Sequence, residues 1–204
     1  IEQAIDQYEM ILSSYPGSKY AIQARLDIAF NLLKQKKYNR SITTLNEFID
    51  KYPDIPASPY AYYLRGVAAE KKSSSILDKI ITDSAQRDVE SVRDAYGYFV
   101  ELIETFPNSK YSEDAKTKLT VLRNILARHE FYVALYYTDI SSNIAAVNRC
   151  KYIIENYPNS ASIPDALHLM AFNYDIINAD ELAKDARIVL ESSYPSYSPN
   201  YSIK

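Results

Sequence analysis

Few residues of this 204-residue chain have types and spacings that support catalysis or metal binding. The two histidines, His129 and His168, lie far apart in the sequence, and His129-Glu130 lacks the second histidine of a zinc-protease helix. The single cysteine, Cys150, forms neither an internal disulfide nor a zinc knuckle. We therefore predict no catalytic residue, no metal and no cofactor, and we interpret Cys150 as a small buried residue.

The composition excludes other classes of site. Three glycines are too few for a glycine-rich phosphate loop or a many-stranded β-fold. The net charge is −3, and no run of basic residues stands out except Lys34, Lys36 and Lys37, which we interpret as a solvated helix end. Nucleic-acid-binding proteins usually carry a basic face, so we expect no nucleic-acid partner. No apolar run reaches the length of a membrane-spanning helix.

An aromatic residue followed by proline recurs along the chain and marks an internal repeat. It occurs at Tyr15-Pro16, Tyr52-Pro53, Phe106-Pro107, Tyr157-Pro158 and Tyr194-Pro195. The intervals between the prolines are 37, 54, 51 and 37 residues. Proline ends a helix because it lacks an N–H and restricts the residue before it. Residues after each proline, such as Asn108-Ser109, offer an N-cap for the next helix.

The residues around each proline follow one pattern. Twelve residues before it the side chain is always small: Ala4, Ser41, Ala95, Ala146 and Ala183. Five residues before it the side chain is always apolar: Ile11, Phe48, Leu102, Ile153 and Leu190. After the first four prolines, small residues recur at Ala24, Ala61, Ala115 and Ala166, then at Ala29, Gly66, Thr120 and Ala171. Small residues let two helices approach closely where they cross, and apolar residues fill the space between layers.

This pattern predicts an all-α tetratricopeptide-type solenoid of about five helix-turn-helix repeats, with lengthened third and fourth repeats. The alternative is a non-repetitive helical bundle. We expect helices over residues 1–14, 18–36, 38–52, 57–72, 87–105, 112–138, 142–156, 162–177 and 180–193. We predict a loop over 72–86, with a short helix near 76–81, and a loosely packed tail over 194–204. The insertion in the fourth repeat equals about four helical turns, which would extend one helix without changing its face.

Tyrosines outside the repeat positions are candidates for a concave binding face: Tyr20, Tyr62, Tyr63, Tyr111, Tyr136 and Tyr137. The alternative is that they pack between helices. Tyr62 and Tyr63 cannot both face the same side of a helix.

The sequence resembles the BamD family of outer-membrane β-barrel assembly lipoproteins. The resemblance rests on residues 106–111 (FPNSKY), 122–130, 145–149 (AAVNR) and 164–167 (PDAL), with 63–66 (YLRG) upstream. It covers nearly the whole chain and is strongest over 106–170. Residues 86–89 (QRDV) and 140–143 (ISSN) depart from the family's usual motifs, which puts local contacts in question.

The resemblance implies a non-catalytic scaffold on the periplasmic face of the outer membrane. An N-terminal acylated cysteine, outside these 204 residues, would hold it at the bilayer. The implied partners are the periplasmic POTRA region of BamA, other Bam lipoproteins and unfolded outer-membrane barrel proteins. Within one solenoid over 1–204, residues 1–105 would receive the barrel proteins' targeting segments and residues 106–204 would bind BamA.

Five residues carry these roles by resemblance. Arg149 resembles the family arginine that pairs with an acidic residue of BamA, and Asn148 beside it is a second candidate. An arginine fork can hold a carboxylate through two hydrogen bonds. The alternative for Arg149 is an intramolecular salt bridge. Arg65, Tyr62 and Tyr20 are candidates for the groove that binds the barrel substrates.

Two other protein classes fit the repeats less well. A periplasmic coordinator of cell-envelope machinery, similar to CpoB, shares the repeat start but favours regular short repeats. A cytoplasmic tetratricopeptide adaptor would clamp a peptide carboxylate with lysine and asparagine. An enzyme would require a pocket of ionisable groups with perturbed pKa values.

Overall fold

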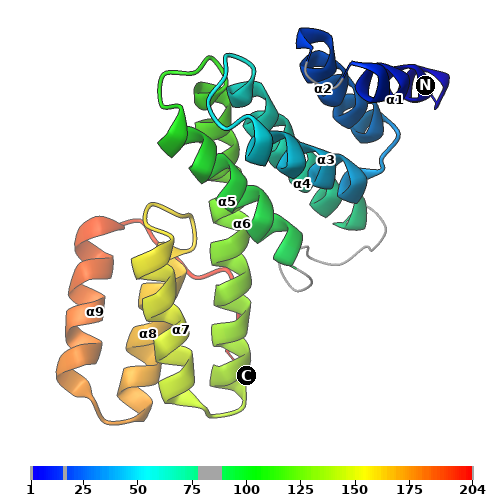
Figure 1. The fold of residues 1–204 in the computed structure, drawn as a ribbon. Coiled ribbons are helices and arrows are strands. Elements are labelled where there is room, and N and C mark those ends of the chain that lie inside the picture. Colours follow the sequence, from blue (N-terminus) through cyan, green and yellow to red (C-terminus); the bar gives the residue numbers. More distant parts are fainter. Residues whose placement is uncertain (1, 16–17, 78–88, 204) are drawn as a thin grey trace. The chain divides into compact units, whose positions relative to one another are not determined.

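The computed structural model describes residues 2–15, 18–77 and 89–203, and within these ranges it contains nine helices and no strand (Figure 1). The predicted all-α fold is therefore confirmed. The helices are α1 (Glu2–Ser14), α2 (Lys19–Lys34), α3 (Tyr38–Lys51), α4 (Ser58–Leu77), α5 (Glu90–Thr105), α6 (Ser112–Asp139), α7 (Asn143–Asn156), α8 (Ile163–Ile176) and α9 (Asp180–Ser193).

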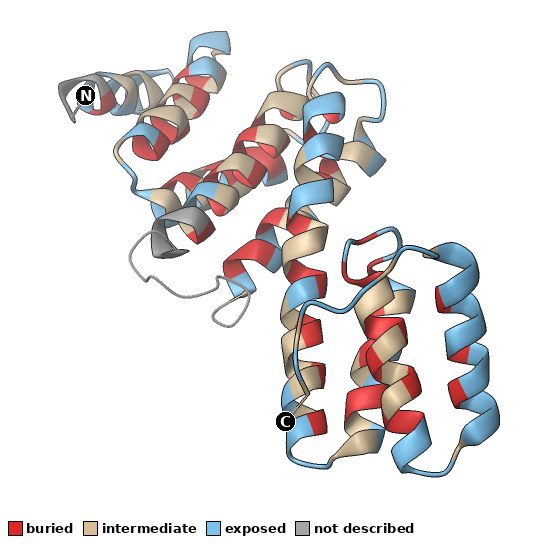
Figure 2. Cartoon of the chain, turned by 180° about the vertical axis from the view of Figure 1, so that it is seen from behind, coloured by how far each residue is buried: buried red, intermediate tan, exposed pale blue. Residues whose placement is uncertain are grey.

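Consecutive helices pack against each other, as expected for a tetratricopeptide-type solenoid. The chain forms two compact units. The first contains α1 to α5 and the start of α6, up to Leu122, and the second continues from Arg123 through α9 and the tail. Buried residues lie along the helix faces that meet within each unit (Figure 2). The functional division at residues 105 and 106 remains a proposal.

The aromatic-proline pairs end helices as predicted. Helices α1, α3, α5, α7 and α9 each end two residues before the proline. In every case the aromatic residue's N–H donates to the carbonyl four residues earlier, at 2.8–2.9 Å: Ile11, Phe48, Leu102, Ile153 and Leu190. These are the apolar positions of the repeat. Each therefore both contributes an apolar side chain and accepts the last hydrogen bond of its helix.

The small residues of the repeat lie at buried helix crossings. Four of the five positions have no exposed surface: Ser41, Ala95, Ala146 and Ala183. Ser41 Oγ donates a 2.8 Å hydrogen bond to the Ala29 carbonyl of the preceding helix, so its hydroxyl is satisfied without water. The side chain of the fifth residue, Ala4, lies outside the described part of the chain.

The first-helix positions follow the pattern except in the lengthened repeat. Ala29 is buried, but Thr120 and Val121, at the corresponding positions of α6, are exposed. Ala134 lies about four helical turns beyond Thr120 and is fully buried. Because the insertion in α6 equals about four helical turns, Ala134 lies on the same helix face as Thr120 and takes the buried small-residue position. The prediction of one long helix in this repeat is confirmed.

Two predictions about helix boundaries are wrong. Residues 72–77 belong to α4 and do not start the predicted loop. Serine lowers helix propensity only modestly, so the helix continues through the serines of this segment. The rest of the predicted loop, residues 78–86, lies outside the described ranges. Ser109 does not cap α6, which begins at Ser112. Ser112 Oγ instead donates across the proline turn to the Phe106 carbonyl at 2.6 Å, and Ser58 Oγ makes the equivalent 2.6 Å bond to Tyr52.

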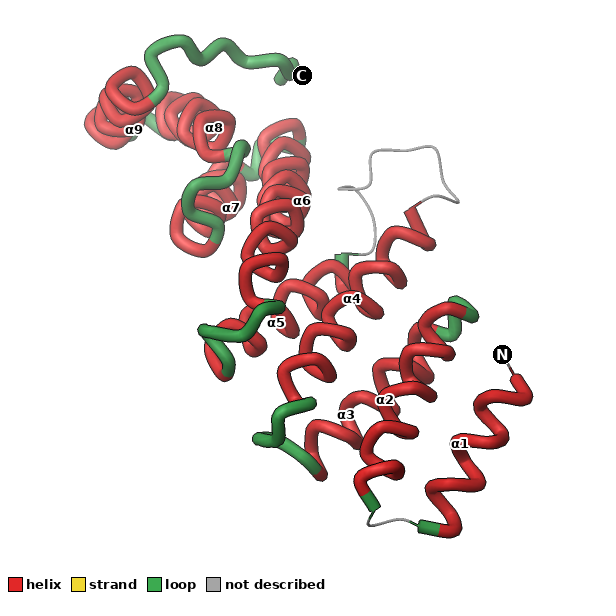
Figure 3. The backbone as a smooth tube through the Cα atoms, turned by 90° about the horizontal axis from the view of Figure 1, so that it is seen from above, coloured by secondary structure: helices red, strands yellow, loops and turns green. Residues whose placement is uncertain are grey.

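The C-terminal tail is anchored, contrary to the predicted loose packing. It passes from α9 across α8 toward α6 (Figure 3). Tyr197 Oη donates to an Asp165 carboxylate oxygen at 2.7 Å, and Tyr201 Oη lies 2.7 Å from His168 Nδ1. The Tyr201 ring also meets Phe131 edge-on, with centroids 4.9 Å apart. Tyrosine combines an apolar ring with a polar tip, so two of them fix a tail that lacks secondary structure.

Candidate protein-docking site

Arg149 and Asn148 lie beside an open hollow between α6 and α7 in the second unit. The hollow has a volume of about 310 Å³ and is lined by Tyr137, Ala145, Asn148, Arg149 and Tyr152. Asn148 and Tyr152 are exposed. The family-derived candidates therefore lie at a surface with two aromatic rings, a composition typical of protein-binding surfaces.

Arg149 is paired within the chain but remains accessible. Its Nη1 donates to Glu130 Oε2 at 2.9 Å, which is the intramolecular alternative considered from the sequence. The Glu130 side chain is only 6% exposed, whereas that of Arg149 is 43% exposed. A guanidinium has five N–H donors, so this one bond leaves donors for a second carboxylate. The buried Glu130 orients Arg149 and leaves its outer edge accessible.

A second hollow of about 360 Å³ borders the first through the shared residue Ala145. It lies at the turn before α7 and includes Ile144 and Ile177. Four isoleucines at this end of the unit are exposed: Ile140, Ile144, Ile176 and Ile177. Ile144 is 67% exposed. A group of exposed branched apolar residues is uncommon on a monomeric surface and is typical of a protein-binding site.

The groove candidates Arg65 and Tyr62 of α4 are buried in the first unit. The Arg65 guanidinium bonds to Asn46 Oδ1 at 3.1 Å and pairs with Glu101. It also lies over the rings of Tyr62 and Tyr98, 5.1 and 4.2 Å from their centroids. In this structure Arg65 therefore links α3, α4 and α5, and it presents little surface to a ligand.

The remaining tyrosine candidates are divided between packing and exposure. Tyr20, at the start of α2, is 65% exposed, and Tyr136 of α6 is also exposed. Tyr63 stacks on Tyr111 at 5.1 Å and donates a 2.7 Å hydrogen bond to Asp114. Burial and that carboxylate raise the pKa of Tyr63 above its ordinary value.

Sequence reasoning did not identify Glu130 or the four isoleucines. Only the fold brings Glu130 to Arg149, which lies 19 residues later on the next helix. The sequence positions of two of the isoleucines do indicate exposure. Ile140 and Ile177 lie at hairpin turns, and an apolar residue in a turn has no helix face on which to be buried.

Neither a metal site nor a reactive thiol is found in the described parts of the chain. No three of their His, Cys, Asp or Glu residues are grouped closely enough to hold a metal ion. Cys150 is fully buried, as predicted, and burial raises the pKa of its thiol to about 12. At neutral pH this thiol is protonated and a poor nucleophile. Of the described helices, none combines the length and apolar character needed to cross a membrane.

Comparison with known proteins gives consistent matches over most of the chain. A family described as "Outer membrane lipoprotein" matches residues 1–189. The outer membrane protein assembly factor BamD of Neisseria gonorrhoeae is 35% identical over 194 residues, covering 95% of this chain and 73% of that protein. The BamD of Xylella fastidiosa strain 9a5c is 32% identical over 93% of this chain and 65% of the relative. That of Vibrio cholerae is 27% identical over 84% and 71%.

Proposed function

Because this chain belongs to the outer membrane lipoprotein family that includes the BamD assembly factors, we propose that it is a non-catalytic accessory subunit of the outer-membrane β-barrel assembly complex. The observation that carries the proposal is the 35% identity to a named assembly factor over 95% of the chain. The stacked helices provide surface for binding other proteins, which suits a scaffold. In this role it acts at the periplasmic face of the outer membrane.

We assign BamA binding to the two bordering hollows of the second unit. Arg149 provides the charged contact, and the exposed isoleucines provide the apolar area. Interfaces obtain most of their affinity from a few such residues surrounded by nearly neutral contacts. The acidic group of BamA would bind the outer edge of the guanidinium while Glu130 holds the inner edge.

Reversing the charge of Arg149 tests this assignment. Arg149→Glu places a carboxylate beside buried Glu130 and opposite the acidic group of the partner. We expect affinity for the periplasmic POTRA domains of BamA to fall at least tenfold, measured by calorimetry or surface plasmon resonance. Ile144→Ser removes exposed apolar area without affecting a charge pair and should also weaken binding.

Arg187→Glu is the matched control. Arg187 is 47% exposed, lies in the same unit and also pairs with a carboxylate of its own chain, that of Asp175. This variant should bind BamA as the unmodified protein does. If Arg149→Glu binds equally well, or if Arg187→Glu loses as much affinity, Arg149 is not part of the interface.

We further propose that the first unit contacts unfolded barrel proteins through its exposed aromatic residues. Tyr20 is the accessible candidate, whereas Arg65 and Tyr62 would support the surface from within. A photo-crosslinking residue at position 20 should capture a peptide with the C-terminal segment of a barrel protein. The same residue at the exposed position 152 of the second unit is the control. Equal capture at both positions would contradict a site in the first unit.

A further inference from the structure

One end of the first unit carries a concentration of positive charge that the assembly role does not use. Residues 30–42 contain four basic side chains and no acidic one: Lys34, Lys36, Lys37 and Arg40. All four are exposed. The end of α4 adds Lys71, which is exposed, and half-buried Lys72. The whole chain has more acidic than basic residues, so these two segments are a local exception to its charge.

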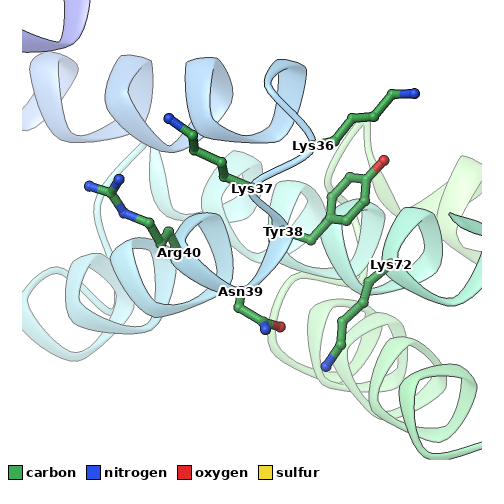
Figure 4. A pocket seen from close by; sticks show the side chains of 6 residues that line it. All are labelled: Lys36, Lys37, Tyr38, Asn39, Arg40 and Lys72. Carbon is green, nitrogen blue, oxygen red and sulfur yellow. The ribbon is translucent and has the colours of Figure 1, made fainter. Parts of the chain in front are cut away.

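The turn between α2 and α3 projects these side chains outward. Residues 36–40 and Lys72 surround an open hollow of about 410 Å³ (Figure 4). Lys36 adopts the left-handed conformation, with φ at 60°, where the chain reverses. The ends of Lys36, Lys37, Arg40 and Lys72 diverge from one another in Figure 4. A site for one small anion would need its cations to converge, so this arrangement suits many anionic groups spread over a surface.

Within the two segments that carry these basic side chains, acidic side chains are few. Over residues 30–42 and 70–72, Glu70 is the single acidic residue, and its carboxylate bonds to Lys118 Nζ of α6 at 2.8 Å. Lys34 keeps its charge in contact with solvent while its ammonium lies 4.6 Å from the Phe30 ring centroid. Within residues 30–42 and 70–72 the basic side chains therefore outnumber the acidic ones by six to one.

The start of α1 lies at the same end of the first unit. Helices α1 to α4 alternate in direction, so the start of α1 and the end of α2 lie on one side, with the start of α3 and the end of α4 (Figures 1 and 3). The family consists of outer membrane lipoproteins, so a lipid bilayer is a surface that its members meet. A lipid joined to the chain ahead of α1 would bring this basic end toward the bilayer.

We propose that Lys34, Lys36, Lys37, Arg40, Lys71 and Lys72 form a contact surface for anionic phospholipid headgroups, which orients the first unit against the membrane. Phosphate groups in a bilayer present a plane of negative charge that diverging cations can contact together. Basic residues near such a surface each add to the attraction, and the attraction falls off within a Debye length.

Vesicle co-sedimentation tests the proposal. The unlipidated chain is mixed either with vesicles of phosphatidylcholine alone or with vesicles that also contain phosphatidylglycerol. We expect binding to the anionic vesicles only, and loss of that binding at high salt. The double substitution Lys36→Gln and Arg40→Gln should weaken binding at least fivefold, because two exposed cations are removed.

The matched control removes the same charge elsewhere. Lys110 lies in the α5–α6 turn at the other end of the first unit, and Lys184 lies on α9; both are exposed. Lys110→Gln with Lys184→Gln should change vesicle binding less than twofold, and circular dichroism should show all variants folded. Equal binding to neutral and anionic vesicles, or equal loss in both double variants, would overturn the proposal. Binding of a polyglutamate peptide without vesicle binding would overturn it too and assign this end to an acidic protein segment.

Discussion

Gly66 lies where α4 packs tightly against Phe99 of its neighbour α5. A Cβ atom built at this position would lie 2.6 Å from a ring carbon of Phe99. The Phe99 ring is fully buried and cannot move aside without opening the core. The contact with Phe99 therefore explains why the repeat pattern has a small residue at this position.

Replacing this glycine should destabilise the protein although alanine favours helices. Gly66→Ala is expected to lower the free energy of unfolding by about 1–3 kcal/mol, because overpacking outweighs the helix-propensity gain. Thermal unfolding measures the change. Gly97→Ala, on α5, is the control, since nothing lies within 4 Å of the added Cβ. That variant should be stabilised by about 0.5–1 kcal/mol. A stabilised Gly66→Ala protein would show that α4 and α5 lie further apart.

Protonation of His168, which contacts Tyr201 of the tail, should make the stability of the protein depend on pH. Burial lowers the pKa of His168, an effect that Asp165 opposes and Arg187 supports. The folded protein therefore favours the neutral imidazole. Between the folded pKa and the unfolded value of about 6.5, the unfolded state binds more protons. The free energy of unfolding should thus fall as the pH decreases through about 6.5, and the loss is complete below the folded pKa.

Denaturant unfolding at pH 7.5 and 5.5 measures this effect. His168→Gln keeps a hydrogen-bonding side chain for Tyr201 but does not titrate. Its stability should change less between the two pH values than that of the unmodified protein. Tyr197 also lies in this cluster, but its pKa is raised by burial and by Asp165, so it does not ionise in this range. Equal pH dependence in both proteins would exclude His168 as the cause.

At the scale of elements, each helical hairpin depends on a small residue at its crossing. Ala146, on α7, has no exposed surface. Ala146→Leu should lower the free energy of unfolding by about 1–3 kcal/mol, because the larger side chain separates packed helices. Asn148→Leu introduces the same side chain two residues away at an exposed position, and its effect should stay within about 0.5 kcal/mol. Denaturant titration that gives equal effects would show that α7 has no specific crossing there.

The hairpin turns repeat a geometry that the sequence pattern did not reveal. Lys36, Ser141 and Asn178 all have φ between 57° and 60°, and all three stand at the same spacing before the proline of the next aromatic-proline pair. The residue after each donates to the carbonyl five residues before itself: Leu32, Tyr137 and Tyr174. Glycine usually occupies this left-handed position. Its absence from all three turns is why sequence reasoning located the hairpins but not their geometry.

At the scale of the whole molecule, a destabilising substitution should lower stability mainly in the helices near it. In stacked helical repeats each element contacts mainly its neighbours, so a destabilised end loosens before the rest. Ile5 of α1 packs with Ile28 and Leu32 of α2. Ile5→Ala should lower hydrogen-exchange protection in α1 and α2 and leave α8 and α9 unchanged. Leu190→Ala, at a buried position near the end of α9, should show the reverse pattern. Equal loss throughout the chain in either variant would indicate one cooperative unit.

The sequence by itself determined the order of the helices, the helix ends that precede the aromatic-proline pairs and the small residues at the crossings. Proline stops a helix by its own covalent structure, so Pro53 and Pro158 act in the same way in any surroundings. Small residues at the crossings are a requirement of backbone approach that recurs with the repeat, as at Ser41 and Ala146. The family could also be identified from the sequence, because residues 106–170 keep its motifs in order.

Only the tertiary structure decided which side chains are available. Arg149 and Arg65 were both proposed as contact residues, yet Arg149 keeps an accessible edge beside Glu130, whereas Arg65 is enclosed by α3, α4 and α5. The docking of Tyr201 against α6 and α8 likewise depends on partners far away in the sequence. Burial and ion pairing are properties of neighbours brought together by folding, and no local pattern specifies which neighbours those are.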